Sequence, residues 1–168
     1  MSRHGWHDDG DDNPPFRVAG RVVTVAAMGS NSHRRIVVGI DGSKNSAKAL
    51  DWAVATANKG DTVVLLTAWS PVIVPAEMAV TYTFDDAGAR KVLDTERSRV
   101  AAAAESAGVD LDTDFETTDP RTALLGAKAD TIVIGARGHG GVMGLLLGSV
   151  ADYVARHSKV PVVIVPAP

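Results

Sequence analysis

From about residue 34 onward, short apolar runs take turns along the chain with segments of helical apolar spacing. Short continuous apolar runs lack the period-two alternation of a half-exposed strand, so they predict strands that are buried on both faces. These runs cover residues 36–40, 62–69, 131–134 and 160–165. Within residues 111–117, carboxylates instead occupy every second position, which predicts a strand with one wetter face near a sheet edge. Pro161 lacks a backbone donor and predicts that the last strand is also an edge.

The segments between these strands carry apolar residues three and four positions apart, which is the spacing of an amphipathic helix. The first helix is expected after a cap at Ser43 or Ser46 and before Gly60. The third helix is short and is expected to have Asp119 as its cap and Pro120 as its first residue. The second and fourth helices are expected at residues 85–107 and 144–157.

Strands that are joined by helices run parallel with right-handed crossovers. The pattern therefore predicts an α/β protein with a single three-layer, doubly wound, Rossmann-like domain and a five-stranded parallel sheet. Ligands of such sheets bind at the carboxyl ends of the strands. Asp41, Ala68 and Gly135 follow the first, second and fourth strands, so they mark the expected ligand end of the sheet.

Residues 1–33 differ in composition from the rest of the chain, because they are mostly polar and include four aspartates. This composition predicts a disordered N-terminal tail before a domain at residues 34–168. The irregular spacing of His4, His7 and the aspartates favours a solvated segment over a metal site. Either Met1 or Met28 is the natural start, since a short polar lead into the first strand follows Met28.

Charge and cysteine content exclude several classes of function. The formal net charge is -3 and the charges are interspersed, so no basic face is expected to attract nucleic acid or an anionic membrane. The absence of cysteine excludes disulfides and thiolate chemistry and agrees with a reducing compartment. No apolar run approaches the roughly 18 residues of a membrane span, and no secretory leader is evident. We therefore expect a cytoplasmic protein.

Six glycines lie between residues 135 and 149, directly after a predicted strand and up to a predicted helix. Glycine permits positive φ and lets backbone amides approach a ligand without an intervening Cβ, as an anion cradle requires. The helix start adds free amides and a favourable dipole. The alternative interpretation is a flexible connection or tight packing between strand and helix. Neither a Gly-Lys-Ser/Thr ending nor the dinucleotide glycine spacing is present.

The spacing of Gly135, Gly138, Gly148 and Ser149 resembles Gly-x2-Gly-x9-Gly-Ser/Thr, the signature of the nucleotide-binding branch of the universal stress protein family. The resemblance extends to IVVGIDGS, to SAKALDWA and to the closing VPVVIVP, and it covers residues 34–168. It implies a fold of the adenine nucleotide alpha hydrolase type. Between Pro120 and Asp130, the connecting helix is shorter than in the family pattern, so the resemblance does not extend to the neighbouring sheet edge.

The resemblance also implies which residues contact the nucleotide. Asp41 would contact the adenosine end, and backbone near Ile40 and Ala68 would help to seat the base. The phosphates would meet the loop and the helix start, at Gly135, Arg137, Gly138, Gly148, Ser149 and Val150. Two alternatives remain open, in which Asp41 caps the following helix and Arg137 forms a surface salt bridge.

The implied function is that of a stress-response sensor or adaptor that holds ATP, with or without Mg²⁺; AMP, ADP and cyclic AMP remain open. A homodimer through the apolar final strand between Val160 and Val165 and an unidentified protein partner are also expected. The alternatives are a slow ATPase and a dimeric interaction module that does not use nucleotide. We assign no catalytic or metal-binding residue; His139 is the one loop side chain able to accept a proton near neutral pH.

Overall fold

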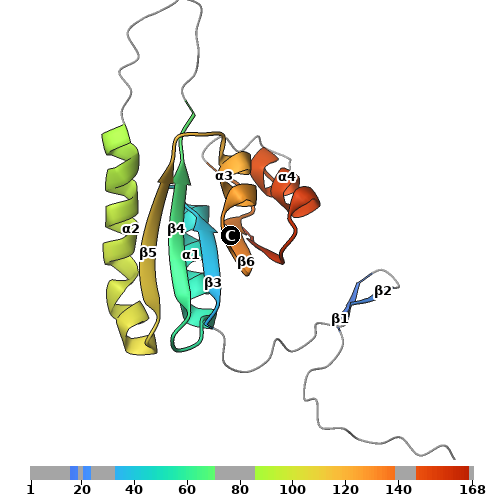
Figure 1. Ribbon diagram of the computed structural model, residues 1–168, viewed down its shortest axis with the longest axis horizontal. Helices are drawn as coiled ribbons and strands as arrows, with labels where there is room; N and C mark the ends of the chain where they lie inside the picture. The colour runs from blue at the N-terminus through green and yellow to red at the C-terminus, as the bar shows by residue number, and fades with distance from the viewer. Residues whose placement is uncertain (1–15, 19–20, 24–32, 71–85, 139–146, 167–168) are drawn as a thin grey trace, which may run out of the picture. The chain divides into compact units, whose positions relative to one another are not determined.

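A computed structural model describes residues 16–18, 21–23, 33–70, 86–138 and 147–166, in two compact units, Met1–Ser32 and His33–Pro168 (Figure 1). In the first unit, β1 (Phe16–Val18) pairs antiparallel with β2 (Arg21–Val23). The composition of the segment did not predict this hairpin. The disorder expected for residues 1–33 stays a prediction, because the other residues of the first unit lie outside the described ones.

The second unit contains a five-stranded sheet whose strands all run parallel in the order β5-β4-β3-β6-β7. This order confirms the predicted sheet and both predicted edges. The first strand lies in the middle, and the winding direction reverses between β3 and β6, where ligands of such sheets bind. The strands are β3 (Arg35–Gly39), β4 (Thr62–Ala68), β5 (Asp110–Glu116), β6 (Thr131–Gly135) and β7 (Val162–Val165).

Four helices in the described part of the chain cover the two faces of the sheet and complete three layers (Figure 1). On the central strand, Ile36 and Val38 pack into one core with residues of α1 (Lys44–Thr56) and α2 (Asp86–Ala107). Val37, which points to the other face, packs with residues of α3 (Pro120–Gly126) and α4 (Ser149–His157). None of the helices that the structure describes is long and apolar enough to cross a lipid bilayer.

The starts of α1 and α3 follow the expected capping chemistry. Ser43 is the N-cap of α1, because its side chain accepts the Ser46 N–H at 3.2 Å. Ser46, the other candidate, is buried and its hydroxyl donates to the Ser43 carbonyl at 2.9 Å. Asp119 caps α3, accepting the N–H of Arg121 at 2.9 Å, and Pro120 is the first helical residue.

The expected start of α4 at residue 144 is wrong for the part of that segment that the structure describes. Leu147 is in a bend, and Gly148 has extended backbone, with φ −74° and ψ 161°, as the N-cap of a helix that begins at Ser149. Residues 144–146 lie outside the described ones. Apolar spacing at Leu147 extended the predicted helix too far, because it reflects packing against the sheet rather than helical backbone.

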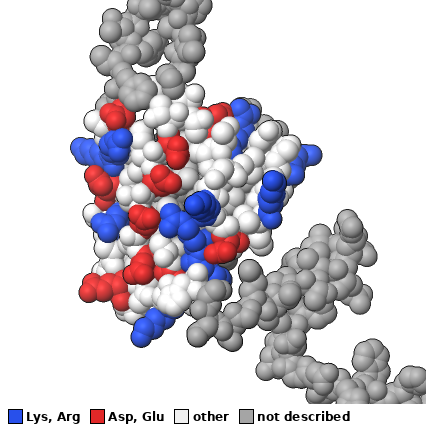
Figure 2. All heavy atoms as spheres, viewed as in Figure 1, with Lys and Arg blue, Asp and Glu red and all other residues white. Residues whose placement is uncertain are grey.

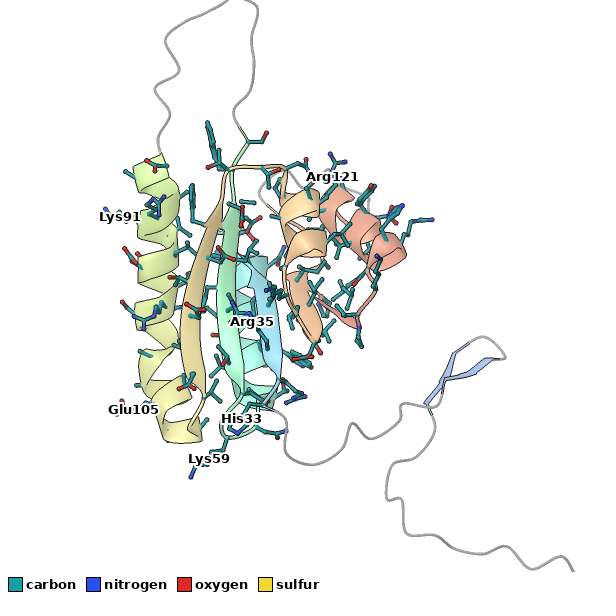
Figure 3. All side chains as sticks on the ribbon, viewed as in Figure 1. His33, Arg35, Lys59, Lys91, Glu105 and Arg121 are labelled. Atoms are coloured by element: carbon teal, nitrogen blue, oxygen red, sulfur yellow. The ribbon has the colours of Figure 1, made fainter. Side chains whose placement is uncertain are left out.

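The short α3 leaves the outer part of one sheet face without a helix above it (Figure 1). β5 nevertheless pairs with β4 along all seven residues, so the sheet edge is intact. The carboxylates predicted for a wetter face, Asp112, Asp114 and Glu116, share this open face, and Figure 2 shows acidic side chains there. Arg35, labelled in Figure 3, lies among them, with a guanidinium nitrogen 3.4 Å from a carboxylate oxygen of Asp112.

Candidate functional site

A cavity of about 380 Å³ lies at the carboxyl ends of β3, β4 and β6, bounded by α3 and α4. Its volume is in the range of roughly 300 to 1,000 Å³ that is typical of small-molecule sites. All nine residues assigned by the resemblance line it: Ile40, Asp41, Ala68, Gly135, Arg137, Gly138, Gly148, Ser149 and Val150. The fold thus brings residues from four separate segments to the predicted end of the sheet.

The cavity also has a wall that the sequence analysis missed. Pro120 and Leu124 of α3 line it, together with Leu66 of β4. The strand-end rule was applied to the first, second and fourth strands, although α3 follows the carboxyl end of β5 in the same way. Applying it to β5 as well would have found this wall. The remaining lining residues among those described are Gly39, Ser46, Ile134, Ala136, Leu147 and Ala151.

Asp41 lies immediately after β3 and organises the turn that leads into α1. Its Oδ1 accepts the N–H of Ser43 at 2.9 Å. Because Ser43 itself is the N-cap, the alternative interpretation of Asp41 as the helix cap is wrong. The other carboxylate oxygen of Asp41 lies against Gly138, where an added Cβ would collide with it. The Asp41 carboxylate therefore lies beside the start of the glycine-rich loop.

The backbone of Ile40 forms a rigid part of the cavity wall. Its N–H donates to the carbonyl of Leu66 at 2.8 Å, and its carbonyl accepts the buried hydroxyl of Thr67 at 2.8 Å. These two bonds fix the end of β3 against the end of β4. Ala68, the last residue of β4, is half-buried and lines the same side of the cavity.

Gly135, at the start of the loop, is required by close approach of backbone rather than by unusual backbone conformation. A Cβ on Gly135 would lie 2.8 Å from the carbonyl carbon and the Cβ of Asn45 in α1. Neither Gly135 nor Gly138 is among the described glycines with positive φ. The close approach at Gly135 is to the protein itself, which supports the alternative interpretation of tight packing between strand and helix. Positive φ is wrong at both positions, and close approach of a ligand stays a prediction.

Backbone hydrogen bonds join the two ends of the loop to each other and to the sheet. The Gly148 N–H donates to the Ala136 carbonyl at 2.7 Å, and the Ala136 N–H donates to the Val165 carbonyl at 2.8 Å. The loop residues 139–146, including His139, lie outside the described ones. The described ends of the loop are thereby held next to the start of α4.

The start of α4 presents backbone amides to the cavity. Gly148 supplies no side-chain cap, and the first bond within the helix runs from the Asp152 N–H to the Gly148 carbonyl at 2.9 Å. Helix geometry therefore leaves the N–H groups of Ser149, Val150 and Ala151 without an acceptor in the helix. All three residues line the cavity, and the helix dipole favours negative charge there.

Arg137 adds a positive charge to the same end of the cavity. Its side chain forms no ion pair with any residue that the structure describes, so the surface salt-bridge alternative finds no support there. Within the described ranges, no three His, Asp or Glu side chains gather as metal ligands. The arrangement combines amides, one guanidinium and an apolar wall, which suits an organic anion.

Residues 32–166 match the profile of the universal stress protein family. The chain belongs to this family. Among curated relatives, a universal stress protein of Mycobacterium bovis is 29% identical over 150 residues, with 78% of this chain and 47% of the relative covered. The chain thus spans about half the length of the first curated relatives that it matches. A universal stress protein of Methanocaldococcus jannaschii is 29% identical over 156 residues, with 86% of this chain and 89% of the relative covered.

Solved structures confirm the universal stress protein fold. The structure of UspA from Lactobacillus plantarum superposes with a TM-score of 0.66 at 26% identity and covers 80% of this chain and 99% of its own. A universal stress protein solved in complex with cAMP has a TM-score of 0.59 at 29% identity, with 82% of this chain and 100% of that chain covered.

Proposed function

We propose that this universal stress protein binds an adenine nucleotide, ATP in the first place, and acts as a cytoplasmic sensor or adaptor in a stress response. The observation that carries the proposal is the meeting, in one cavity, of the glycine-rich loop ends with the uncapped N-terminus of α4. The related universal stress protein in complex with cAMP supports an adenine nucleotide as the ligand class.

The two sides of the cavity suit the two ends of such a ligand. The amides of Gly138, Ser149 and Val150, with the Arg137 guanidinium, would hold the phosphates. The apolar side, with Leu66, Ala68, Pro120 and Leu124, would take the base, and the Asp41 carboxylate would accept hydrogen bonds from the sugar. The glycine at position 148 leaves room in the cradle that a side chain would fill.

The chemistry of the described lining favours binding over turnover. Asp41 is the one carboxylate among the described lining residues, and no lysine is among them. Phosphoryl transfer usually needs a metal, a cation at the phosphates and a residue that positions water. Arg137 supplies the cation. The slow ATPase therefore remains the weaker alternative, and the nucleotide state itself is the proposed signal.

Calorimetric titration of the purified chain tests the proposed function. We expect ATP to bind with one site per chain, and a parallel titration with GTP tests whether the site prefers adenine. Titrations with AMP, ADP and cyclic AMP, with and without Mg²⁺, identify the preferred ligand. Failure to detect any adenine nucleotide would favour the nucleotide-independent interaction module.

We also propose a homodimer through the final strand. All four residues of β7 are apolar and half-exposed, and β7 is an edge of the sheet. An apolar edge of this kind can pair with a second copy by a two-fold axis. Light scattering on Val163→Asp should report a monomer. Thr113→Asp on the opposite edge is the control and should stay dimeric; a folded Val163→Asp dimer would place the interface elsewhere.

A further inference from the structure

Asn45 connects the first turn of α1 to the start of the glycine-rich loop. It is the second residue of the helix and is half-buried. Its side-chain Nδ2 donates a hydrogen bond to the carbonyl of Arg137 at 2.9 Å, across 92 positions of sequence. The backbone of Asn45 is also what a Cβ on Gly135 would meet at 2.8 Å. Asn45 therefore touches the loop at the strand end and again two residues later.

The hydrogen bond fixes the direction of one peptide group. The carbonyl of Arg137 points toward α1, and in a planar trans peptide the following N–H points the opposite way. The N–H of Gly138 is therefore directed away from α1. The nitrogen of Gly138 lies 3.8 Å from the position that a Cβ on Gly148 would occupy, and both glycines line the cavity.

The glycine at position 138 does not by itself hold this peptide group in one direction. Turning the group over changes ψ of Arg137 and φ of Gly138, and glycine accepts nearly any φ. A turned peptide would bring the Arg137 carbonyl oxygen, which carries negative partial charge, to the side where the Gly138 amide now lies. That group would repel a phosphate where the amide attracts one.

We infer that Asn45 is a positioning residue of the nucleotide site: its side-chain amide holds the Arg137–Gly138 peptide with the N–H toward the phosphates. This inference deepens the proposed function and rests on it. It predicts that Asn45 controls the affinity for phosphate-bearing ligands and leaves the nucleoside part of the site unchanged.

The test compares ATP and adenosine on the wild-type chain and on Asn45→Ala by competition titration. We expect Asn45→Ala to weaken ATP binding roughly tenfold, the order of one lost hydrogen bond, and to change adenosine binding less than about twofold. Asn58→Ala is the matched control, because Asn58 is exposed just beyond the other end of α1 and its side chain forms no hydrogen bond with a described residue. It should leave both affinities unchanged.

Two further measurements keep the inference falsifiable. The leucine of Asn45→Leu has a shape similar to asparagine but no hydrogen-bond donor. This variant replaces Asn45→Ala if Asn45→Ala unfolds at a much lower temperature than the parent. In the ligand-free chain, the carbonyl resonance of Arg137 should move in the Asn45 variant and not in Asn58→Ala. Unchanged ATP affinity, or equal losses for ATP and adenosine, would overturn the inference alone. If the wild-type chain binds neither adenosine nor ATP, the proposed function is overturned, and with it the role of Asn45 toward phosphate.

Discussion

The two ends of the glycine-rich loop contain glycine for different physical reasons. At the end of β6, a Cβ on Gly135 would meet the backbone of α1, and one on Gly138 would meet the carboxylate of Asp41. At the start of α4, a Cβ on Gly148 would have Arg137 Cα as its nearest neighbour among the described residues, at an ordinary contact distance of 3.5 Å. The backbone of Gly148 is extended, a conformation that any residue adopts.

Within the one glycine pattern, some positions therefore serve the fold and another serves the proposed function. Gly135 is demanded by packing against backbone, whereas Gly138 meets only the end of the exposed Asp41 side chain. The glycine at position 148 is demanded by neither packing nor conformation in the described structure, so a ligand at the helix start would account for it. Substitutions at the two ends should therefore change different quantities.

The largest effect is expected at the β6 end. Gly135→Ala should lower the free energy of unfolding by about 3 kcal/mol, the upper part of the range for overpacking, since the atoms in the way are backbone. Urea unfolding measures it. Gly126→Ala is the matched control, because a Cβ there meets nothing within 4 Å. Equal stability of the two variants would show that α1 can move away from β6 at little cost.

The opposite result is expected at the α4 end. Gly148→Val should weaken ATP binding about a hundredfold, near 2.7 kcal/mol, because one charge-assisted amide contact is worth about 1.5 to 3 kcal/mol. Its cost in unfolding free energy should stay below about 1 kcal/mol, that of a poorer helix cap. Calorimetry and urea unfolding on the same preparation give both values. A variant that loses stability instead of affinity would remove the contrast between the two ends.

Ser149 sharpens the same contrast on a smaller scale. Ser149→Ala removes a hydroxyl from the cavity lining but keeps every backbone amide of α4. We expect ATP binding to weaken about tenfold, near 1.4 kcal/mol, with unchanged melting temperature. Ser158→Ala, which alters a serine at the other end of α4, should leave ATP affinity unchanged. An Ser149→Ala variant that binds as well as its parent would assign the phosphate contact to backbone alone.

The smallest effect is expected at the cap of α3, on the missed wall of the cavity. Asp119→Ala should lower the unfolding free energy by about 1 kcal/mol, the usual value of a cap, and change ATP affinity less than about twofold. Hydrogen bonds from Arg121 lower the pKa of the Asp119 carboxyl from 3.8 to about 2. Because this pKa is lower in the folded than in the unfolded protein, the ionised carboxyl stabilises the fold at pH values above the unfolded pKa. This contribution is lost as the pH falls toward the folded pKa. The difference in unfolding free energy between Asp119→Ala and the parent should therefore be constant from pH 7 to 5 and shrink between pH 4 and 2.

Most of the fold was predictable because its signals are local. Four continuous apolar runs, one alternating run and the helical spacing between them predicted the strand count and the parallel sheet. The alternation at residues 111–117 and the proline at position 161 predicted the two edges. The sequence predicted the cap at Asp119 and narrowed the cap of α1 to Ser43 or Ser46, since a side chain that bonds its own turn needs no distant partner. The start of α4 was misplaced because apolar Leu147 satisfies helical spacing while it packs in a bend. Local pattern cannot separate these two causes.

The candidate site was predicted in its residues but not in its contacts. The glycine spacing identified Gly135, Gly138 and Gly148, and the structure places all three in one cavity. The hydrogen bond from Asn45 to Arg137 left no local signal, because its two residues lie 92 positions apart. The same holds for Pro120 and Leu124, which reach the cavity only after α3 folds back over the sheet.

The sequence by itself determined which segments become strands and helices and which end of the sheet offers amides to an anion. Those properties follow from the periodicity of apolar residues and from the spacing of glycines, and both are patterns among residues that are close in the sequence. Only the tertiary structure decided what surrounds Gly135, Gly138 and Gly148 and which side chain bonds to the start of the loop. These depend on distances between segments that are far apart in sequence, such as Asn45 beside Gly135 and Asp41 beside Gly138, and such distances exist only once the sheet and its helices have packed.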